Sequence, residues 1–467
     1  MKDKCSYAAT TSFKWLLVVA VSMTTIVLVT IFFKRLWIGM TPHNSHLTAP
    51  YRYPFRQSLE KETNTTTLVQ QEIAFYQERV RQDPQGGLNL TSLARAYLKM
   101  GRATGEGSWY LLAEQAAGRS LTHLPFNNEG AILVLARVAE ARHDFSGAIR
   151  LAQQVLNSQA HNEDALAIMV TSHLAIGKVA QASRAADTLV EQMPSLGSLA
   201  LQALVKVAQG KDQEAIQAFQ AALAAEEPGE KASSAWVRTL LGRFYLQRGQ
   251  LALAEDLYQE ALQILPGYSF ALVQLGELKT RQGDYNNAAN YYNQITAYSR
   301  EAATVFDRVV ERSKARLMLL QGRQNEAIAL FWHQAEILLR QQNASGHHDG
   351  AFGHRRELAQ LLLERGRNED LPEALSLMQT ELSLRRDPQT LDTFAWALSR
   401  SGRWREAQAA IQEALKSGVR DPVLFYRAGE IAKAQGKQSQ AIAYFQLAQE
   451  IDPTFNEQAR RALGMGL

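Results

Sequence analysis

The sequence predicts an all-α protein in which one transmembrane helix precedes a right-handed α-solenoid of about ten helix pairs. Two observations lead to this fold class. Small residues recur mostly every 33 to 35 residues along the 467-residue chain, which is the spacing of a two-helix repeat. Near the amino terminus, nineteen consecutive residues carry no charge, which is enough apolar helix to cross a bilayer.

The formal net charge of +4 is concentrated at the amino terminus. Residues 1–35 contain five Lys or Arg and one Asp, which leaves 45 basic and 45 acidic residues for the rest of the chain. A nucleic-acid-binding protein needs excess positive charge to neutralise phosphates, so the composition predicts no nucleic-acid partner. The only cysteine, Cys5, excludes an intrachain disulfide framework and a multi-cysteine metal site.

The first 67 residues divide into three parts. We expect a short polar tail at 1–13, a transmembrane anchor at 14–35 that contacts the lipid bilayer, and a proline-containing linker at 36–67. The uncharged stretch from Trp15 to Phe33 would form a helix about 28 Å long, close to the hydrocarbon thickness of a bilayer. A cleaved signal peptide is the alternative, although its apolar region usually has about 7 to 15 residues and ends at a small-residue cleavage site.

The side of the membrane follows less directly from the residues. Basic residues flank the apolar stretch at both ends, so their count does not fix its orientation. A body without cysteine suits an oxidising compartment, and we therefore expect a single-pass protein with its solenoid outside the cytoplasm. In the linker, the aromatic residues Tyr51, Tyr53 and Phe55 are predicted either to lie at the membrane interface or to cap the array.

Residues 68–467 contain the repeat. A glycine usually stands five residues before each recurring alanine, and a Phe or Tyr often follows four residues after it. Successive alanines are 35, 34, 33, 39, 34, 39, 47, 33 and 34 residues apart. They are Ala113, Ala148, Ala182, Ala215, Ala254, Ala288, Ala327, Ala374, Ala407 and Ala441.

Each recurring residue has a mechanical role in a helix pair. The glycine takes the left-handed conformation that ends the first helix and lets the second fold back. The alanine is small where the two helices cross, and the aromatic ring fills the neighbouring gap on the same face. Prolines such as Pro194, Pro266 and Pro453 then prevent the second helix from continuing. A pair cannot bury its own apolar faces, so stacking of pairs supplies the core.

The pattern resembles the tetratricopeptide repeat, whose signature is W-x2-L-G-x2-Y…A-x3-F…P. The unit Leu241-Gly242-x2-Tyr245…Ala254-x3-Tyr258…Pro266 matches it, with Arg238 in place of tryptophan. The resemblance extends over about 400 residues. Two units depart from the family pattern: Glu311 and Lys314 stand at apolar positions, and Arg142-His143-Asp144 lacks the glycine. We expect the helices of those units to be shifted or more loosely packed.

The sequence contains no H-E-x-x-H, G-x-x-x-x-G-K-[ST], G-x-S-x-G or G-x-G-x-x-G motif. We therefore predict that the protein is not an enzyme and uses no cofactor and no small-molecule substrate. The remaining candidate for such chemistry is a glycine-rich loop with His347, His348, Asp349 and His354. These residue types bind zinc or copper, but a flexible loop does not hold three or four ligands in place. Metal binding at 347–354 is therefore the lesser alternative.

The resemblance implies that the first helix of each pair lines a concave groove for a partner segment. Arg312 and Arg316 lie one helical turn apart, and Arg356 belongs to the next unit. Such a cluster could bind the carboxylate of a partner, unless Asp307 and Glu311 neutralise it. We predict these three arginines as the partner-binding groove, with the solvated, salt-bridged face as the alternative.

The tryptophans Trp236, Trp332, Trp396 and Trp404 are predicted to pack between helices rather than to stack on a ligand. Taken together, these expectations describe a membrane-anchored scaffold or assembly factor whose partners are other, membrane-associated proteins. A signal-processed soluble adaptor is the alternative. The repeat alanines, from Ala148 to Ala441, are the predicted contacts between paired helices.

Overall fold

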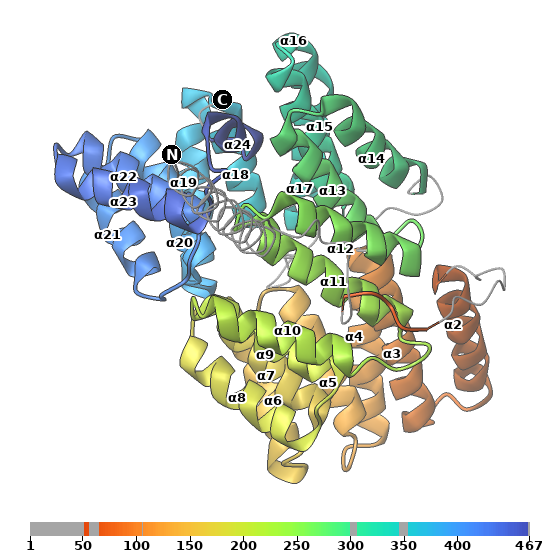
Figure 1. The fold of residues 1–467 in the computed structure, drawn as a ribbon. Coiled ribbons are helices and arrows are strands. Elements are labelled where there is room, and N and C mark those ends of the chain that lie inside the picture. Colours follow the sequence, from red (N-terminus) through yellow and green to blue (C-terminus); the bar gives the residue numbers. More distant parts are fainter. Residues whose placement is uncertain (1–50, 56–64, 105, 299–305, 345–353, 466–467) are drawn as a thin grey trace, which may run out of the picture. The chain divides into compact units, whose positions relative to one another are not determined.

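The computed structural model describes residues 51–55, 65–104, 106–298, 306–344 and 354–465. Every regular element in these ranges is helical, and none of the described residues lies in a strand. The helix α2 (Thr65–Gln82) comes first, and ten helix pairs follow it along the chain (Figure 1). The short helix α24 (Glu457–Ala462) ends the array.

The first helices of the ten pairs are α3 (Gly87–Thr104), α5 (Glu129–Ala141), α7 (Glu163–Ala175), α9 (Leu196–Ala208), α11 (Lys231–Leu246), α13 (Ser269–Gln282), α15 (Asp307–Leu320), α18 (Arg355–Arg365), α20 (Pro388–Arg400) and α22 (Pro422–Ala434). Nine of the second helices are α4 (Gly107–His123), α6 (Phe145–Ser158), α8 (Val179–Gln192), α10 (Asp212–Ala224), α12 (Leu251–Ile264), α14 (Tyr285–Tyr298), α19 (Leu371–Leu384), α21 (Trp404–Leu415) and α23 (Gln438–Ile451).

The second helix of the seventh pair is broken. It consists of α16 (Gln324–Glu326), a π-helical turn over Ala327–Trp332 and α17 (His333–Ala344). A π-turn adds a residue to one turn of helix and therefore rotates the faces that follow it. This is one of the two units that depart from the family pattern, although α15, which carries Glu311 and Lys314, is itself a regular helix. The helices on either side of Arg142–Asp144 are regular as well.

The repeat alanines, which were predicted to contact the paired helix, are buried. All ten, from Ala113 to Ala441, have no exposed surface. Next to this contact, the aromatic ring of the second helix lies against a glycine of the first. A Cβ atom placed on Gly242 would lie 2.5 Å from the Tyr258 ring, and Gly276 and Gly429 have the same relation to Tyr292 and Phe445. The glycines therefore let the rings approach the backbone of the first helix.

We expect Gly242→Ala to lower the free energy of unfolding by about 1–3 kcal/mol, because the added methyl group overpacks the contact with Tyr258. Gly118→Ala is the matched control. Gly118 lies inside α4 with open space around it, so alanine there should leave stability equal or higher through its better helix propensity. Urea unfolding of both variants measures the difference, and equal effects would contradict the packing role of Gly242.

Turns between paired helices follow the predicted glycine pattern. Gly177, Gly210, Gly249 and Gly283 all have φ between 70° and 80°, in the left-handed region. The pair that lacks the glycine uses His143 instead, with φ of 60°. Its ring stacks on Phe145 with centroids 5.2 Å apart, which helps to hold a conformation that is unfavourable for most residues.

The structure corrects the expected location of the protein. No helix in the part of the chain that the structure describes is both long and apolar enough to cross a bilayer. The longest, α2 and α3, have 18 residues each, and α2 alone contains Glu72, Glu78, Arg79 and Arg81. This finding contradicts the prediction of a single-pass membrane protein. The predicted anchor at 14–35 and the tail at 1–13 lie outside the described residues.

Candidate functional site

The first helices of the pairs form the inner layer of the array. α3, α5, α7, α9, α11 and α13 each contact the next first helix in line, and Figure 1 shows α3, α5, α7 and α9 side by side. Because the first helices lie this close together, the layer curves with them on its concave side. Side chains that point inward from these helices are the candidates for binding a partner.

Three positions recur on each first helix, one, four and five residues after a buried reference residue, and we infer that they lie on the inner face. The reference residues on α5, α7, α9 and α11 are Ala136, Val170, Ala203 and Gly242. We call them the inner positions. On α5, α7, α9 and α11 all of them are half-exposed or exposed. They are Arg137, Glu140 and Ala141; Thr171, Leu174 and Ala175; Leu204, Val207 and Ala208; and Arg243, Leu246 and Gln247.

We infer that these twelve side chains line one continuous surface, which we call the open groove, and their chemistry changes along it. At one end Arg137 and Glu140 form an ion pair of 2.8 Å. In the middle α7 and α9 contribute mainly aliphatic side chains, including Leu174, Leu204 and Val207. At the other end Arg243 is exposed. The groove therefore offers an apolar floor between polar ends, which is a suitable surface for an amphipathic segment.

On α13, the next first helix, two of the three inner positions are buried. On α13, Thr280 and Arg281 are covered by the loop and helix that end the chain. Arg281 donates hydrogen bonds to Asp452 and, over 2.6 Å, to Thr454. The backbone carbonyl of Thr280 accepts one from Gln458 of α24. The carboxyl-terminal segment thus occupies the inner face of α13.

Two of the predicted groove arginines face an internal carboxylate. Arg312 lies 2.6 Å from Glu364 of α18, and Arg316 donates two hydrogen bonds to the same carboxylate and one to the carbonyl of Ala462. Glu364 is buried, which by itself would raise its pKa, but the two guanidinium groups hold the pKa below its usual range. The structure therefore brings Arg312 and Arg316 together and places Glu364 where a partner carboxylate would bind.

The third predicted arginine is separate from this pair. Arg356 lies 3.1 Å from Asp387 and 3.2 Å from Thr390, both at the start of α20. All three arginines thus have partners within the chain. Their role in binding another protein stays a prediction, and sequence reasoning did not identify Glu364 as the residue that pairs with two of them.

The predicted metal-binding loop lies mostly outside the described residues, since these end at 344 and resume at 354. Among the described residues there is no group of three or more His, Cys, Asp or Glu that could hold a metal ion. His354 itself is described. Its ring centroid is 6.3 Å from that of His143, and burial together with Arg308 lowers the pKa of His354 to about 3.

The aromatic residues of the linker contact the array. The Tyr51 hydroxyl lies 3.0 Å from that of Tyr245 on α11 and accepts a hydrogen bond from Gln220 on α10. The backbone N–H of Tyr53 donates to Glu260 of α12 over 2.8 Å, and its ring packs against the apolar cluster around Ala261. Residues 51–55 therefore bind between α10 and α12, in the middle of the array rather than at its end as a cap.

Arg238 holds this segment in place. It stands at the tryptophan position of the repeat signature, has no exposed surface and forms a buried ion pair with Glu226. Its Nε donates to the Tyr51 carbonyl over 2.8 Å, and its guanidinium lies over the Tyr53 ring. Glu226 belongs to the inserted loop before α11. The arginine at the tryptophan position and the inserted loop that carries Glu226 thus both help to hold residues 51–55.

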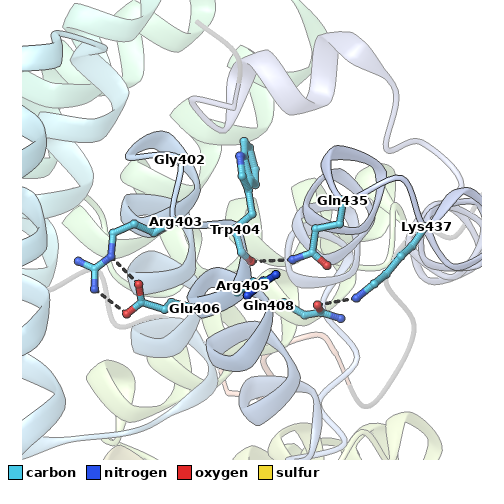
Figure 2. Close-up of a pocket in the computed structure, with 8 residues that line it drawn as sticks. All are labelled: Gly402, Arg403, Trp404, Arg405, Glu406, Gln408, Gln435 and Lys437. Carbon is cyan, nitrogen blue, oxygen red and sulfur yellow. Dashed lines mark hydrogen bonds and ion pairs between the residues drawn. The ribbon is translucent and has the colours of Figure 1, made fainter.

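Three of the four predicted tryptophans are at least half-buried. Trp332 is 1% exposed within the core of the seventh and eighth pairs, Trp236 is half-buried, and Trp396 is half-buried beneath the Arg427 guanidinium. Trp404 differs, because 38% of it is exposed at the beginning of α21. It lines an open hollow of about 810 Å³ between α21 and the turn before α23 (Figure 2).

Ten stacked helix pairs with a curved inner layer define an α-solenoid repeat protein. Tetratricopeptide-repeat family models match residues 196–267, 271–311 and 393–454. These three segments of the chain are tetratricopeptide repeats. No curated protein sequence matches it.

Several solved structures are similar to the chain. The human IFIT1 dimer with PPP-AAAA is 15% identical, with 84% of this chain and 96% of that chain covered and a TM-score of 0.43. Yeast Tom70 is 16% identical, with 82% and 86% covered and a TM-score of 0.40. The hetero-tetramer of Cut9 and Hcn1 from the APC/C is 13% identical, with 85% of this chain and 93% of that chain covered and a TM-score of 0.38.

Proposed function

We propose that the protein is an interaction scaffold that holds a segment of a partner protein in the open groove of α5, α7, α9 and α11. The repeats themselves indicate a protein–protein interaction scaffold. The observation that carries the finer proposal is the contrast between α5 to α11 and the next first helix, α13. The inner positions are accessible from α5 to α11, whereas on α13 the chain's own carboxyl-terminal segment covers them.

The chemistry of the groove specifies the kind of segment. Leu174, Leu204 and Val207 favour aliphatic side chains spaced along one face of the partner. Arg243 at the α11 end favours an acidic residue next to them, because an exposed guanidinium binds a carboxylate with directed hydrogen bonds. We therefore expect an amphipathic helical or extended segment with an acidic residue at one end.

Peptide selection tests this proposal directly. Peptides selected from a random displayed library on the full chain should contain apolar residues and an acidic residue, and Leu204→Asp should abolish their binding. Ile442→Asp is the matched control, since Ile442 is an exposed aliphatic residue on α23, outside the groove. Fluorescence polarisation measures binding, and thermal unfolding checks that both variants stay folded. Equal binding by the two variants would place the site elsewhere.

A further inference from the structure

The segment at 51–55 lies on the array in the manner of an extended ligand. Its side chains alternate, since Tyr51, Tyr53 and Phe55 are half-buried and the two residues between them are exposed. A period of two is that of an extended chain with one face on a surface. None of the five residues is fully buried, so the segment covers the array without forming part of its core.

The array binds the backbone of this segment as well as its side chains. Arg238 donates to the carbonyl oxygen of Tyr51, and Glu260 accepts from the N–H of Tyr53, each over 2.8 Å. Any extended peptide offers the same C=O and N–H groups, so these two bonds recognise a backbone. The Tyr51 hydroxyl meets that of Tyr245, and the Tyr53 ring packs on an apolar cluster of α11 and α12. These two contacts add a preference for aromatic side chains two positions apart.

The residue that holds the backbone departs from the repeat pattern. Other units have an apolar side chain at the position of Arg238, such as Leu272 in α13 and Phe425 in α22. The buried ion pair of Arg238 with Glu226 adds little net stability compared with an apolar contact, so packing alone does not account for it. What the arginine provides instead is an N–H group directed at a peptide carbonyl. This substitution therefore indicates a recognition site.

We propose that this surface of α10, α11 and α12 is a recognition site for an extended segment with aromatic residues two positions apart. Residues 51–55 occupy it as an internal ligand, and a segment of a partner protein with the same pattern displaces them. The internal occupant specifies the chemistry of the partner, because both make the same backbone bonds and ring contacts. Arg238, Tyr245 and Glu260 are not among the twelve side chains of the open groove, so this is a second, independent site.

The internal ligand competes with the partner because it belongs to the same chain. A tethered ligand has an effective concentration on the order of 1 mM. A segment that is bound about ten times as often as it is free at that concentration has a Kd of about 0.1 mM. A partner segment of similar affinity therefore binds the wild type more weakly than a chain whose own aromatic side chains have been removed.

Peptide binding to a chain with an emptied site tests this proposal. The probe is a fluorescent peptide of residues 49–57, and the emptied chain is the full-length Tyr51→Ala/Tyr53→Ala variant. By fluorescence polarisation, the peptide should bind the emptied chain at one site and the wild type about tenfold or more weakly. A peptide with alanine at both tyrosine positions should not bind, whereas alanine in place of the exposed Arg52 should leave binding unchanged.

A change in the site itself locates the bound peptide. In the emptied chain, Glu260→Ala should weaken binding about tenfold, because the peptide N–H loses its charged acceptor. Glu255→Ala on the same helix is the matched control, since the Glu255 carboxylate pairs with Lys279 instead. Equal effects of the two variants would overturn the proposal. So would a folded emptied chain that does not bind the peptide, or equal binding by the emptied chain and the wild type.

A second measurement keeps both tyrosines of the segment in place. In the full chain with Cys5→Ser, a fluorescent label on Arg52→Cys lies at an exposed position and leaves the site intact. Adding the unlabelled peptide at millimolar concentration should lower the anisotropy of the label, because the displaced segment rotates more freely. The peptide with alanine at both tyrosine positions should have no effect. Unchanged anisotropy with the native peptide would refute the displacement, whether or not the emptied chain folds.

Discussion

Replacing Glu226 by Gln is expected to lower the free energy of unfolding by about 3–5 kcal/mol, because the buried Arg238 guanidinium would lose its counter-charge. The segment at 51–55 should be released as well, since Arg238 holds its backbone at Tyr51. Urea unfolding measures the first effect, and limited proteolysis within 51–55 measures the second.

Two further variants test whether the loss of stability comes from the uncompensated charge of Arg238. Glu78→Gln removes an exposed ion pair with Arg81 on α2 and should change stability little. The double variant Glu226→Gln/Arg238→Met removes both buried charges and should recover much of the lost stability. If the single and double variants were equally unstable, the uncompensated charge of Arg238 would not be the cause.

Replacing Glu364 by Gln should cost a similar amount, about 3–5 kcal/mol near neutral pH, because Arg312 and Arg316 share this one buried carboxylate. The effect should depend on pH. Since its folded-state pKa is held below the usual value of 4.5, ionised Glu364 stabilises the folded state above about pH 4.5. That contribution is lost as the pH falls through the folded-state pKa.

The difference in stability between the wild type and Glu364→Gln should therefore be largest at neutral pH and shrink in acid. Urea unfolding at stepwise lower pH measures it, with Glu78→Gln as the control for general effects of carboxylate protonation. A difference that stayed constant across this range would show that the charge of Glu364 does not hold the two arginines.

Local structure was predictable from the sequence because its causes are local. A glycine such as Gly210 ends a helix through its own backbone, and an alanine such as Ala215 meets a helix only a few residues away. The same reasoning located the irregular seventh pair, where Glu311 and Lys314 interrupt the apolar pattern. It did not foresee that His143 could replace a turn glycine, because few side chains adopt that conformation.

The contacts that bury part of the inner face do not recur with the repeat. No pattern in the sequence therefore predicts them. Arg281 pairs with Asp452 across 171 residues, and Arg316 with Glu364 across 48. A repeat pattern predicts neighbours in the stack, whereas these pairs depend on the curvature summed over several repeats. Arg312 and Arg316 thus suggested a cationic surface, but the structure pairs both with the Glu364 carboxylate of another helix.

The central claim is that the carboxyl-terminal pairs dock on the turns of the middle pairs and cover the inner face of α13, whereas α5 to α11 stay open for a partner. A spin-label distance between Lys211 and Lys416 tests it most directly, because both are exposed and flank the contact of Gly210 with Gly418. With Cys5 replaced by Ser, the docked array predicts one narrow distribution at short distance. A long, broad distribution would contradict it, since an open spiral separates these positions by several repeats.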